Sequence, residues 1–327
     1  MRSIRRSFLL YPAALGAAAL WPFAAHADSR DTQPIRLVVP FGAGGVADLT
    51  ARVVGKAMAG QLGQPVVVDN RPGAGGVVAG TMVASAAPDG LTLLLMSNGT
   101  AVSEGLFQKL PFDTRKDFAP ISLLGYFDLA IVVPEASPLR SLADLVAAAK
   151  ARPGALNIGT VNVGSTQHLS AELFKSRAGI DVQVVPFNGT PAVVTALRSG
   201  QIDAAVEILS PVMPQITGKA LRAIAVMGER RNPALPSVPT AAEGAGLKGF
   251  DVRSWNALAA PGKTPRERVD RLNRAVRAAL ASAEVQQQLA TLNVQPRAGT
   301  PEELAALLDS EIRRWSGVIA AAGIPRQ

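Results

Sequence analysis

Residues 35–48 read IRLVVPFGAGGVAD, and this stretch decides the expected fold. Its first half, residues 35–39, is an apolar run of the kind found in strands that are buried on both faces. The three glycines within residues 42–45 then allow a tight turn, which brings backbone N–H groups close to a ligand. Apolar residues recur at helical spacing from Val46 to Met58. Because the first N–H groups of a helix lack internal partners and the dipole is positive there, this turn predicts an anion site.

Residues 1–27 have the features of a cleaved signal peptide. Arginines precede an apolar run from Phe8 to Phe23, and residues 25–27 (AHA) fit the A-x-A cleavage pattern. Residues 5–9 (RRSFL) also fit a twin-arginine signal, so the general and the twin-arginine export routes both stay open. Cleavage lowers the net charge from +8 to +5, and the chain has no Cys for a disulfide or a lipid anchor. We therefore expect a periplasmic protein with a mild bias toward anionic ligands.

Strand and helix patterns alternate along the mature chain, which predicts an α/β fold with mostly parallel sheets flanked by helices. The strands expected in a first unit are residues 35–39, 65–69 and 91–96, and those in a second unit are 129–133, 156–160, 182–185, 202–207 and 221–227. A further strand is expected at 250–259, followed by helices at 265–281, 283–292 and 301–321. These three helices have no substantial strand between them, so they cannot form an independent α/β domain and should pack on the first unit. We therefore predict a discontinuous domain 1 (33–125 plus 250–327) and an inserted domain 2 (126–249), joined by two strand crossings.

The glycine turn also permits a different function. Residues 42–47 (GAGGVA) fit the dinucleotide pattern G-x-G-x-x-A between a strand and a helix, through Gly42, Gly44 and Ala47. Asp69, at the end of the next strand, is placed to hold a ribose. An exported dinucleotide-binding oxidoreductase is therefore the alternative, although dinucleotides are scarce outside the cytoplasm.

Catalysis has little support in the sequence. After cleavage the only His is His168, and the chain has no Cys, no G-x-S-x-G elbow, no phosphate loop and no set of residues with metal-ligand spacing. We therefore expect no enzyme activity, no metal and no cofactor. The strand ends instead offer Gly, Ser, Thr and Asn, neutral donors that suit a carboxylate gripped between two hinged domains. The basic residues are scattered, so we expect no binding to nucleic acid. We also expect a monomer.

Seven short motifs follow one another along the chain. They are VPFGAGGVAD (39–48), VDNRPGAGG (68–76), APDG (87–90), QHL (167–169), VPFNG (185–189), GQIDA (200–204) and LPSVPT (235–240). Over the whole mature chain the sequence resembles Bug proteins, the extracytoplasmic solute receptors of tripartite tricarboxylate transporters. The resemblance implies a Venus-flytrap fold. It also implies capture of a small carboxylate (a di- or tricarboxylate, an amino acid or an aromatic acid) and its delivery to integral membrane subunits.

The resemblance further implies which residues line the cleft. They are Phe41, Gly42, Ala43, Gly44, Gly45, Asp48, Ser97, Asn98, Thr100, Asn162, Val163, Gly164, Ser165, Thr166, His168, Asn188, Gly189 and Glu207. The family often has Pro where Gly42 stands. Glu207 would place a negative charge in the wall, which suggests a ligand with an amino group, a hydroxyl or a ring nitrogen, unless the side chain points to solvent or pairs with an Arg.

Several of these residues also have a purely structural interpretation. Asp48 can simply favour the start of its helix, and His168 can be satisfied by the local backbone. Asp69 is expected to bind the turn at residues 70–73, and Arg52 to form a salt bridge. Trp255 is interpreted as either cleft wall or core, and Trp315 as core.

Overall fold

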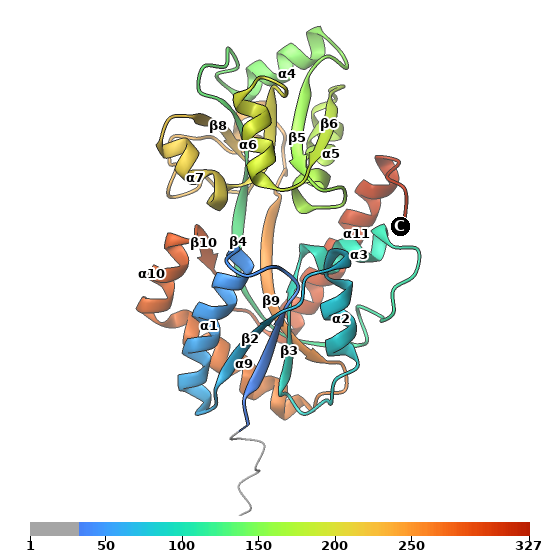
Figure 1. Ribbon diagram of the computed structural model, residues 1–327, viewed down its shortest axis with the longest axis vertical. Helices are drawn as coiled ribbons and strands as arrows, with labels where there is room; N and C mark the ends of the chain where they lie inside the picture. The colour runs from blue at the N-terminus through green and yellow to red at the C-terminus, as the bar shows by residue number, and fades with distance from the viewer. Residues whose placement is uncertain (1–32) are drawn as a thin grey trace, which may run out of the picture.

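The computed structural model describes residues 33–327, and it is a mixed α/β fold whose elements gather into two halves along the long axis (Figure 1). The strands β4 (Phe118–Pro134) and β9 (Arg253–Pro261) are drawn in the middle, where the two halves meet. The proposed signal peptide, residues 1–27, lies outside the described residues.

The lower half in Figure 1 contains the opening stretch of sequence. Its strands follow the order β2 (Val66–Asn70), β1 (Ile35–Val39), β3 (Thr92–Ser97), β9 and β4, and β10 (Val294–Pro296) pairs with β4. β1, β2 and β3 are parallel, as predicted, whereas β9 runs antiparallel to both β3 and β4. The glycine turn therefore lies at the carboxyl end of a parallel strand, where α/β sheets bind ligands.

Helices cover both faces of this sheet, because alternate residues of its strands point to opposite sides. Leu37, Val39 and Leu95 pack on one side with α1 (Val46–Leu62), α9 (Arg266–Ala281) and α10 (Ala283–Thr291). Val38 and Met96 pack on the other side with α2 (Val77–Ala84), α3 (Asn98–Leu106) and α11 (Pro301–Ala321). A 3-10 turn, η2 (Ala74–Gly76), precedes α2.

The upper half repeats the same arrangement. The strands β7 (Ala204–Ile208), β5 (Asn157–Val161) and β6 (Gln183–Phe187) are parallel, and β7 and β8 (Leu221–Val226) pair antiparallel with β4. One face packs on α6 (Thr190–Arg198) and α7 (Leu209–Thr217). The other packs on α4 (Leu142–Ala151), α5 (Thr166–Ala178) and α8 (Ala241–Ala245).

Several elements differ from the expectation: α7, α8 and β10 were not predicted, and β4 and α3 differ in ways that bear on the site. The strand predicted at 129–133 is the last part of β4, whose earlier residues pair with β9 while residues 129–134 pair with β7 and β8. The polar group at 97–100 does not simply end a strand, because Asn98 begins the helix α3. The boundaries of the two predicted domains stay a prediction, since β4 continues through residues 125 and 126 without interruption.

The two tryptophans both belong to the core. Trp315 is fully buried on α11 with Ile312 and Ile319, as predicted from their helical spacing. Trp255 is also buried, so it is a core residue and not a cleft wall. Within residues 33–327, none of the helices is long and apolar enough to cross a membrane.

Candidate functional site

The loop at residues 41–45 joins β1 to α1, and all five of its residues are exposed. Gly44 has a φ of 84°, a conformation that glycine adopts without strain. Its N–H donates to Asp48 Oδ2 at 2.9 Å, and Arg52 Nε donates to the same oxygen at 3.0 Å. Asn70 Nδ2, at the end of β2, donates to Asp48 Oδ1 at 2.9 Å and to the carbonyl oxygen of Phe41 at 3.0 Å. Asp48 therefore holds the loop in shape.

Electrostatics supports this structural role for Asp48. Burial alone would raise the pKa of its carboxyl, but the hydrogen bonds from Arg52, Gly44 and Asn70 outweigh burial and lower the pKa. The side chain is 1% exposed and both oxygens are occupied. Of the interpretations left open by the sequence, the salt bridge of Arg52 is confirmed, and the Asp48 carboxylate faces the protein.

Asp69 corrects one expectation. It is predicted to hydrogen-bond to the backbone of residues 70–73, but its carboxylate accepts from side chains, from Arg36 Nε at 2.6 Å and from Arg71 Nε at 3.0 Å. Burial acts to raise its pKa, and the bonds from Arg36 and Arg71 lower it further than burial raises it. The pair of arginines on one carboxylate leaves it poorly placed to hold a ribose.

The N-terminus of α3 lies at the carboxyl end of β3. Ser97 Oγ accepts from the Gly99 N–H at 3.1 Å, and Thr100 Oγ1 accepts from the Ser97 N–H at 3.2 Å, so both hydroxyls cap the helix. Asn98 Nδ2 donates to the Arg253 carbonyl at 3.3 Å, while its Oδ1 is buried and has no partner among the described residues. Ser97 and Thr100 thus have structural partners already, and Asn98 retains an unused acceptor.

Asn256 is a polar residue that the sequence analysis missed. It lies on β9 directly opposite Ser97, is 2% exposed, and neither its Nδ2 nor its Oδ1 has a partner within residues 33–327. An unpaired buried amide is unfavourable unless water or a ligand completes it. Asn98 and Asn256 therefore place unused amide groups at the carboxyl end of β3. The only sequence signal was an Asn between Trp255 and the apolar residues 257–260.

The corresponding loop of the upper half, residues 162–165, joins β5 to α5. Ser165 caps the helix by accepting from the His168 N–H at 3.1 Å, and its own hydroxyl donates to the Val161 carbonyl at 2.6 Å. Gly164 has a φ of 79°, and a Cβ built there would lie 2.5 Å from Leu106 Cδ2. Leu106 ends α3, so this loop packs directly against the lower half of the molecule.

His168 is bonded to its local backbone, which is the structural interpretation of this residue. It is 6% exposed, burial lowers its pKa, and its Nδ1 accepts weakly from the Gly164 N–H at 3.4 Å. A neutral imidazole bonded to its own loop supports the turn. Asn162 and Val163 are exposed and Thr166 is partly exposed, so they remain accessible to solvent.

Glu207 ends β7 beside the N-termini of α5 and α6. It is fully buried, and its Oε2 accepts from Thr190 Oγ1 at 3.0 Å and from Gln167 Nε2 at 3.5 Å. Its Oε1 has no partner among the described residues. Burial raises the pKa to about 7, against the lowering effect of the bonds from Thr190 and Gln167 and of the backbone N–H of Ile208. The side chain therefore neither points to solvent nor pairs with an arginine.

The other residues expected to line the cleft near Glu207 are more accessible. Asn188 is exposed and Gly189, with a φ of 91°, immediately precedes α6. Four helices, α1, α3, α5 and α6, thus begin just after the carboxyl ends of β1, β3, β5 and β6. Such N-termini supply backbone donors and a positive dipole to an anion. Within residues 33–327, no group of three or more acids or histidines is placed to hold a metal.

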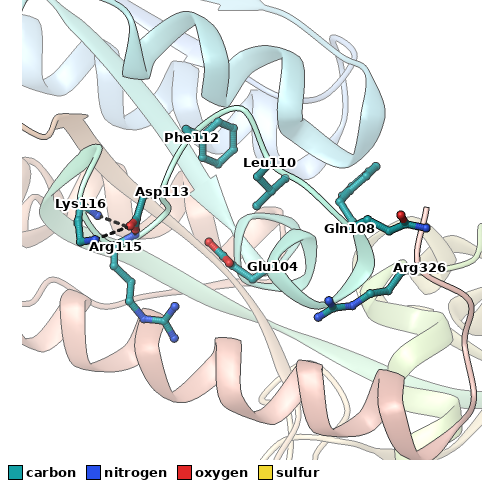
Figure 2. Close-up of a pocket in the computed structure, with 9 residues that line it drawn as sticks. Glu104, Gln108, Leu110, Phe112, Asp113, Arg115, Lys116 and Arg326 are labelled. Carbon is teal, nitrogen blue, oxygen red and sulfur yellow. Dashed lines mark hydrogen bonds and ion pairs between the residues drawn. The ribbon is translucent and has the colours of Figure 1, made fainter.

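A pocket at some distance from these loops does not belong to the proposed cleft. It has a volume of about 530 Å³ beside α3 and the C-terminal segment, and Figure 2 shows its mixture of acidic, basic and apolar side chains. Lys116 pairs with Asp113 at one end, and Arg326 lies at the other, where its Nε donates to the Gly105 carbonyl. None of the residues named for the cleft lines this pocket.

Comparisons with known protein families, sequences and structures agree on one family. Residues 50–324 match the family described as the tripartite tricarboxylate transporter family receptor, TctC. BugT of Bordetella pertussis (strain Tohama I) is 36% identical over 299 residues, which cover 91% of this chain and 91% of BugT. The periplasmic binding protein BugD is 31% identical with a TM-score of 0.76, and the match covers 90% of this chain and 99% of BugD.

Two further structures contain ligands. Rpa4515 of R. palustris with adipate is 33% identical, with a TM-score of 0.79 and coverage of 90% of this chain and 99% of the other. MatC of Rhodopseudomonas palustris with bound malate is 35% identical, with a TM-score of 0.73 and coverage of 88% and 99%. These comparisons give no support to a dinucleotide-binding oxidoreductase. The chain belongs to the tripartite tricarboxylate transporter receptor family and is a solute receptor with the two-domain periplasmic binding protein fold.

Proposed function

We propose that this receptor captures a small carboxylate between the loop at residues 41–45 and the loop at residues 162–166. The observation that carries the proposal is that strand ends of both halves present helix N-termini and neutral polar groups. Among the proposed cleft residues Asp48 and Glu207 are the only formal charges, and Asp48 is bonded within its own loop. A carboxylate can be held by such donors without a cationic side chain.

The mechanism is capture followed by closure. An anion first meets the exposed donors of one half, and rotation about β4 and β9 brings the second half over it. Closure removes water, which strengthens each charge-assisted bond. The contact between Gly164 and Leu106 is one place where the two halves already touch, and the hydrogen bond from Ser210 Oγ to the Leu292 carbonyl at 2.6 Å is another. The closed form then delivers the ligand to integral membrane subunits of a tripartite tricarboxylate transporter, without catalysis.

The related structures support a carboxylate ligand, since one contains adipate and another contains malate. We further propose export of residues 28–327 to the periplasm after removal of residues 1–27, by the general or the twin-arginine route. Domain 1 then comprises residues 33–125 plus 250–327, and domain 2 comprises 126–249. The mature protein acts as a monomer, which size-exclusion chromatography with light scattering will check.

A thermal-shift screen of the mature protein tests the ligand class. Di- and tricarboxylates, amino acids and aromatic acids form the panel, with NAD and NADP as the arm for the rejected alternative. We expect at least one carboxylate to raise the melting temperature and to bind in calorimetry. Stabilisation by NAD or NADP alone would contradict the proposal.

A matched pair of variants tests the loop. Gly42 and Gly60 both have open space around a built Cβ and neither has a positive φ, so leucine fits at either position. Gly42→Leu places a side chain in the proposed site, whereas Gly60→Leu changes only the exposed face of α1. Gly42→Leu is expected to weaken carboxylate binding by at least about tenfold, which is 1.4 kcal/mol. Equal affinities for the two variants would remove the loop from the site.

A further inference from the structure

The environment of Glu207 carries an inference about the ligand itself, and this inference rests on the function proposed above. Glu207 is the penultimate residue of β7, which α7 follows directly, and its side chain is fully buried. Its Oε2 is bonded to Thr190, the first residue of α6, and to Gln167 in the first turn of α5. It therefore lies between the two loops that form the proposed upper wall.

The second oxygen of this carboxyl group has no protein partner. Oε1 is buried and makes no hydrogen bond within the described part of the chain. Thr190 and Gln167 are neutral, and neither arginine nor lysine pairs with Glu207 among residues 33–327. Of the helices packed beside it, α5 carries His168, whose pKa burial lowers, together with Glu172, Lys175 and Arg177, and α6 carries Arg198 in its last turn. None of these side chains forms a hydrogen bond with Glu207 in the structure.

A buried carboxylate without a cation is unfavourable, and removing an ion from water costs several kcal/mol even after relaxation. The missing positive charge can come from the ligand. A second carboxylate on the ligand would instead add like charge next to Glu207, and a hydroxyl would supply a hydrogen bond without offsetting the charge. An ammonium group supplies both the donor that Oε1 lacks and the charge that the site lacks.

We propose that Glu207 selects ligands that carry an ammonium group near their carboxylate, with the ammonium donating a hydrogen bond to Oε1. The carboxylate of such a ligand lies on the helix N-termini, and its ammonium reaches the end of β7. The preferred ligand class is then an amino-carboxylate. The pKa of Glu207, about 7, means that a nearby cation can hold the group in its charged form at neutral pH.

Calorimetry with matched acids tests this assignment. The probes are pairs that differ only in one amino group: succinate and aspartate, glutarate and glutamate, and 3-phenylpropionate and phenylalanine. Measurements at about pH 8 keep Glu207 ionised. In at least one pair the amino acid is expected to bind the mature protein at least about tenfold more tightly than its partner, a difference of 1.4 kcal/mol.

Variants then assign the preference to Glu207. Glu207→Gln should reduce the ratio of affinities within the pair to about one, while Glu207→Asp, which keeps the charge, should retain part of the preference. The control is Glu267→Gln, an exposed residue in the first turn of α9. It should leave the ratio unchanged. Thermal unfolding of each variant confirms that it is folded.

Each result has a defined meaning. Tighter binding of the amino-free acid overturns the inference but leaves the proposed function intact. A preference for the amino acid that survives in Glu207→Gln shows that another residue provides it, and this also overturns the inference. If no acid of any pair binds, and no other carboxylate of the screen binds, the proposed function fails and the inference fails with it.

Discussion

Two buried acidic residues, Asp48 and Glu207, lie at the strand ends of the two halves, and their surroundings are opposite. Asp48 uses both oxygens, receives bonds from Gly44, Arg52 and Asn70, and has a lowered pKa. Glu207 has neutral partners on one oxygen, none on the other, and a raised pKa. The contrast shows that Asp48 is fully hydrogen-bonded within its own loop, whereas Glu207 keeps one oxygen free for the ligand that we propose.

The largest effect is expected from Asp48→Ala. The change removes three charge-assisted hydrogen bonds that hold the loop at residues 41–45, so we expect the free energy of unfolding to fall by about 4 kcal/mol. Urea unfolding monitored by circular dichroism measures this. Asp48→Asn, which keeps the shape but not the charge, should lose less. A loss below about 1 kcal/mol for Asp48→Ala would show that the loop does not depend on this carboxylate.

Glu207→Gln should stabilise the protein relative to wild type as pH rises, in contrast to the loss of stability expected from Asp48→Ala. The folded pKa of Glu207, about 7, lies above the ordinary value of 4.5. The stability that the protonated group contributes is therefore complete below about pH 4.5 and is lost as pH rises to about 7, because the unfolded chain releases its proton first. Relative to wild type, Glu207→Gln should gain on the order of 3 kcal/mol over this range. Urea unfolding at several pH values tests this, and parallel profiles would contradict it.

Gly164→Ala tests whether the halves must touch for binding. The residue has a positive φ and a built Cβ lies 2.5 Å from Leu106 Cδ2, whereas Gly179, also with a positive φ, has open space. Strain in the left-handed conformation should cost both variants about 1 kcal/mol of stability. Only Gly164→Ala should also weaken binding of a carboxylate found in the screen, as calorimetry will measure. Equal affinities in Gly164→Ala and Gly179→Ala would show that this contact plays no part in closure.

The smallest effect is expected from Arg52→Met. Arg52 bonds to Asp48, but its side chain is 50% exposed, and exposed ion pairs contribute less than about 1 kcal/mol. The remaining bonds from Gly44 and Asn70 should keep the loop in place. If urea unfolding shows a loss as large as that of Asp48→Ala, the ion pair, and not the set of bonds on Asp48, holds the lower wall.

Much of the fold could be predicted from local sequence patterns. The strand at residues 35–39 and its glycine turn were placed correctly, because an apolar run followed by three glycines has few other conformations. The length of β4 was missed, since Gly125 and Asp128 interrupt its apolar residues and its pairing with β9 is distant in sequence. The helix α3 was missed because its first residues, Asn98 and Gly99, are typical of turns.

The candidate site was predictable only in outline. The loops at residues 41–45 and 162–166 follow from strand and helix boundaries. The role of Asp48 depends on Asn70, a residue 22 positions away, and the environment of Glu207 depends on Gln167, 40 positions away. Contacts of this kind form only when the strands assemble into the sheet. The local sequence gave only a weak signal for Asn256, because its importance comes from lying opposite Ser97.

Hydrogen–deuterium exchange on the mature protein tests the central claim most directly. It compares the free protein with the protein saturated by a carboxylate from the screen. If the ligand is held between the two halves, exchange must slow in both residues 41–45 and residues 162–166, because their N–H groups become bonded and shielded. Protection of one loop alone, or protection confined to the pocket beside α3, would contradict the account.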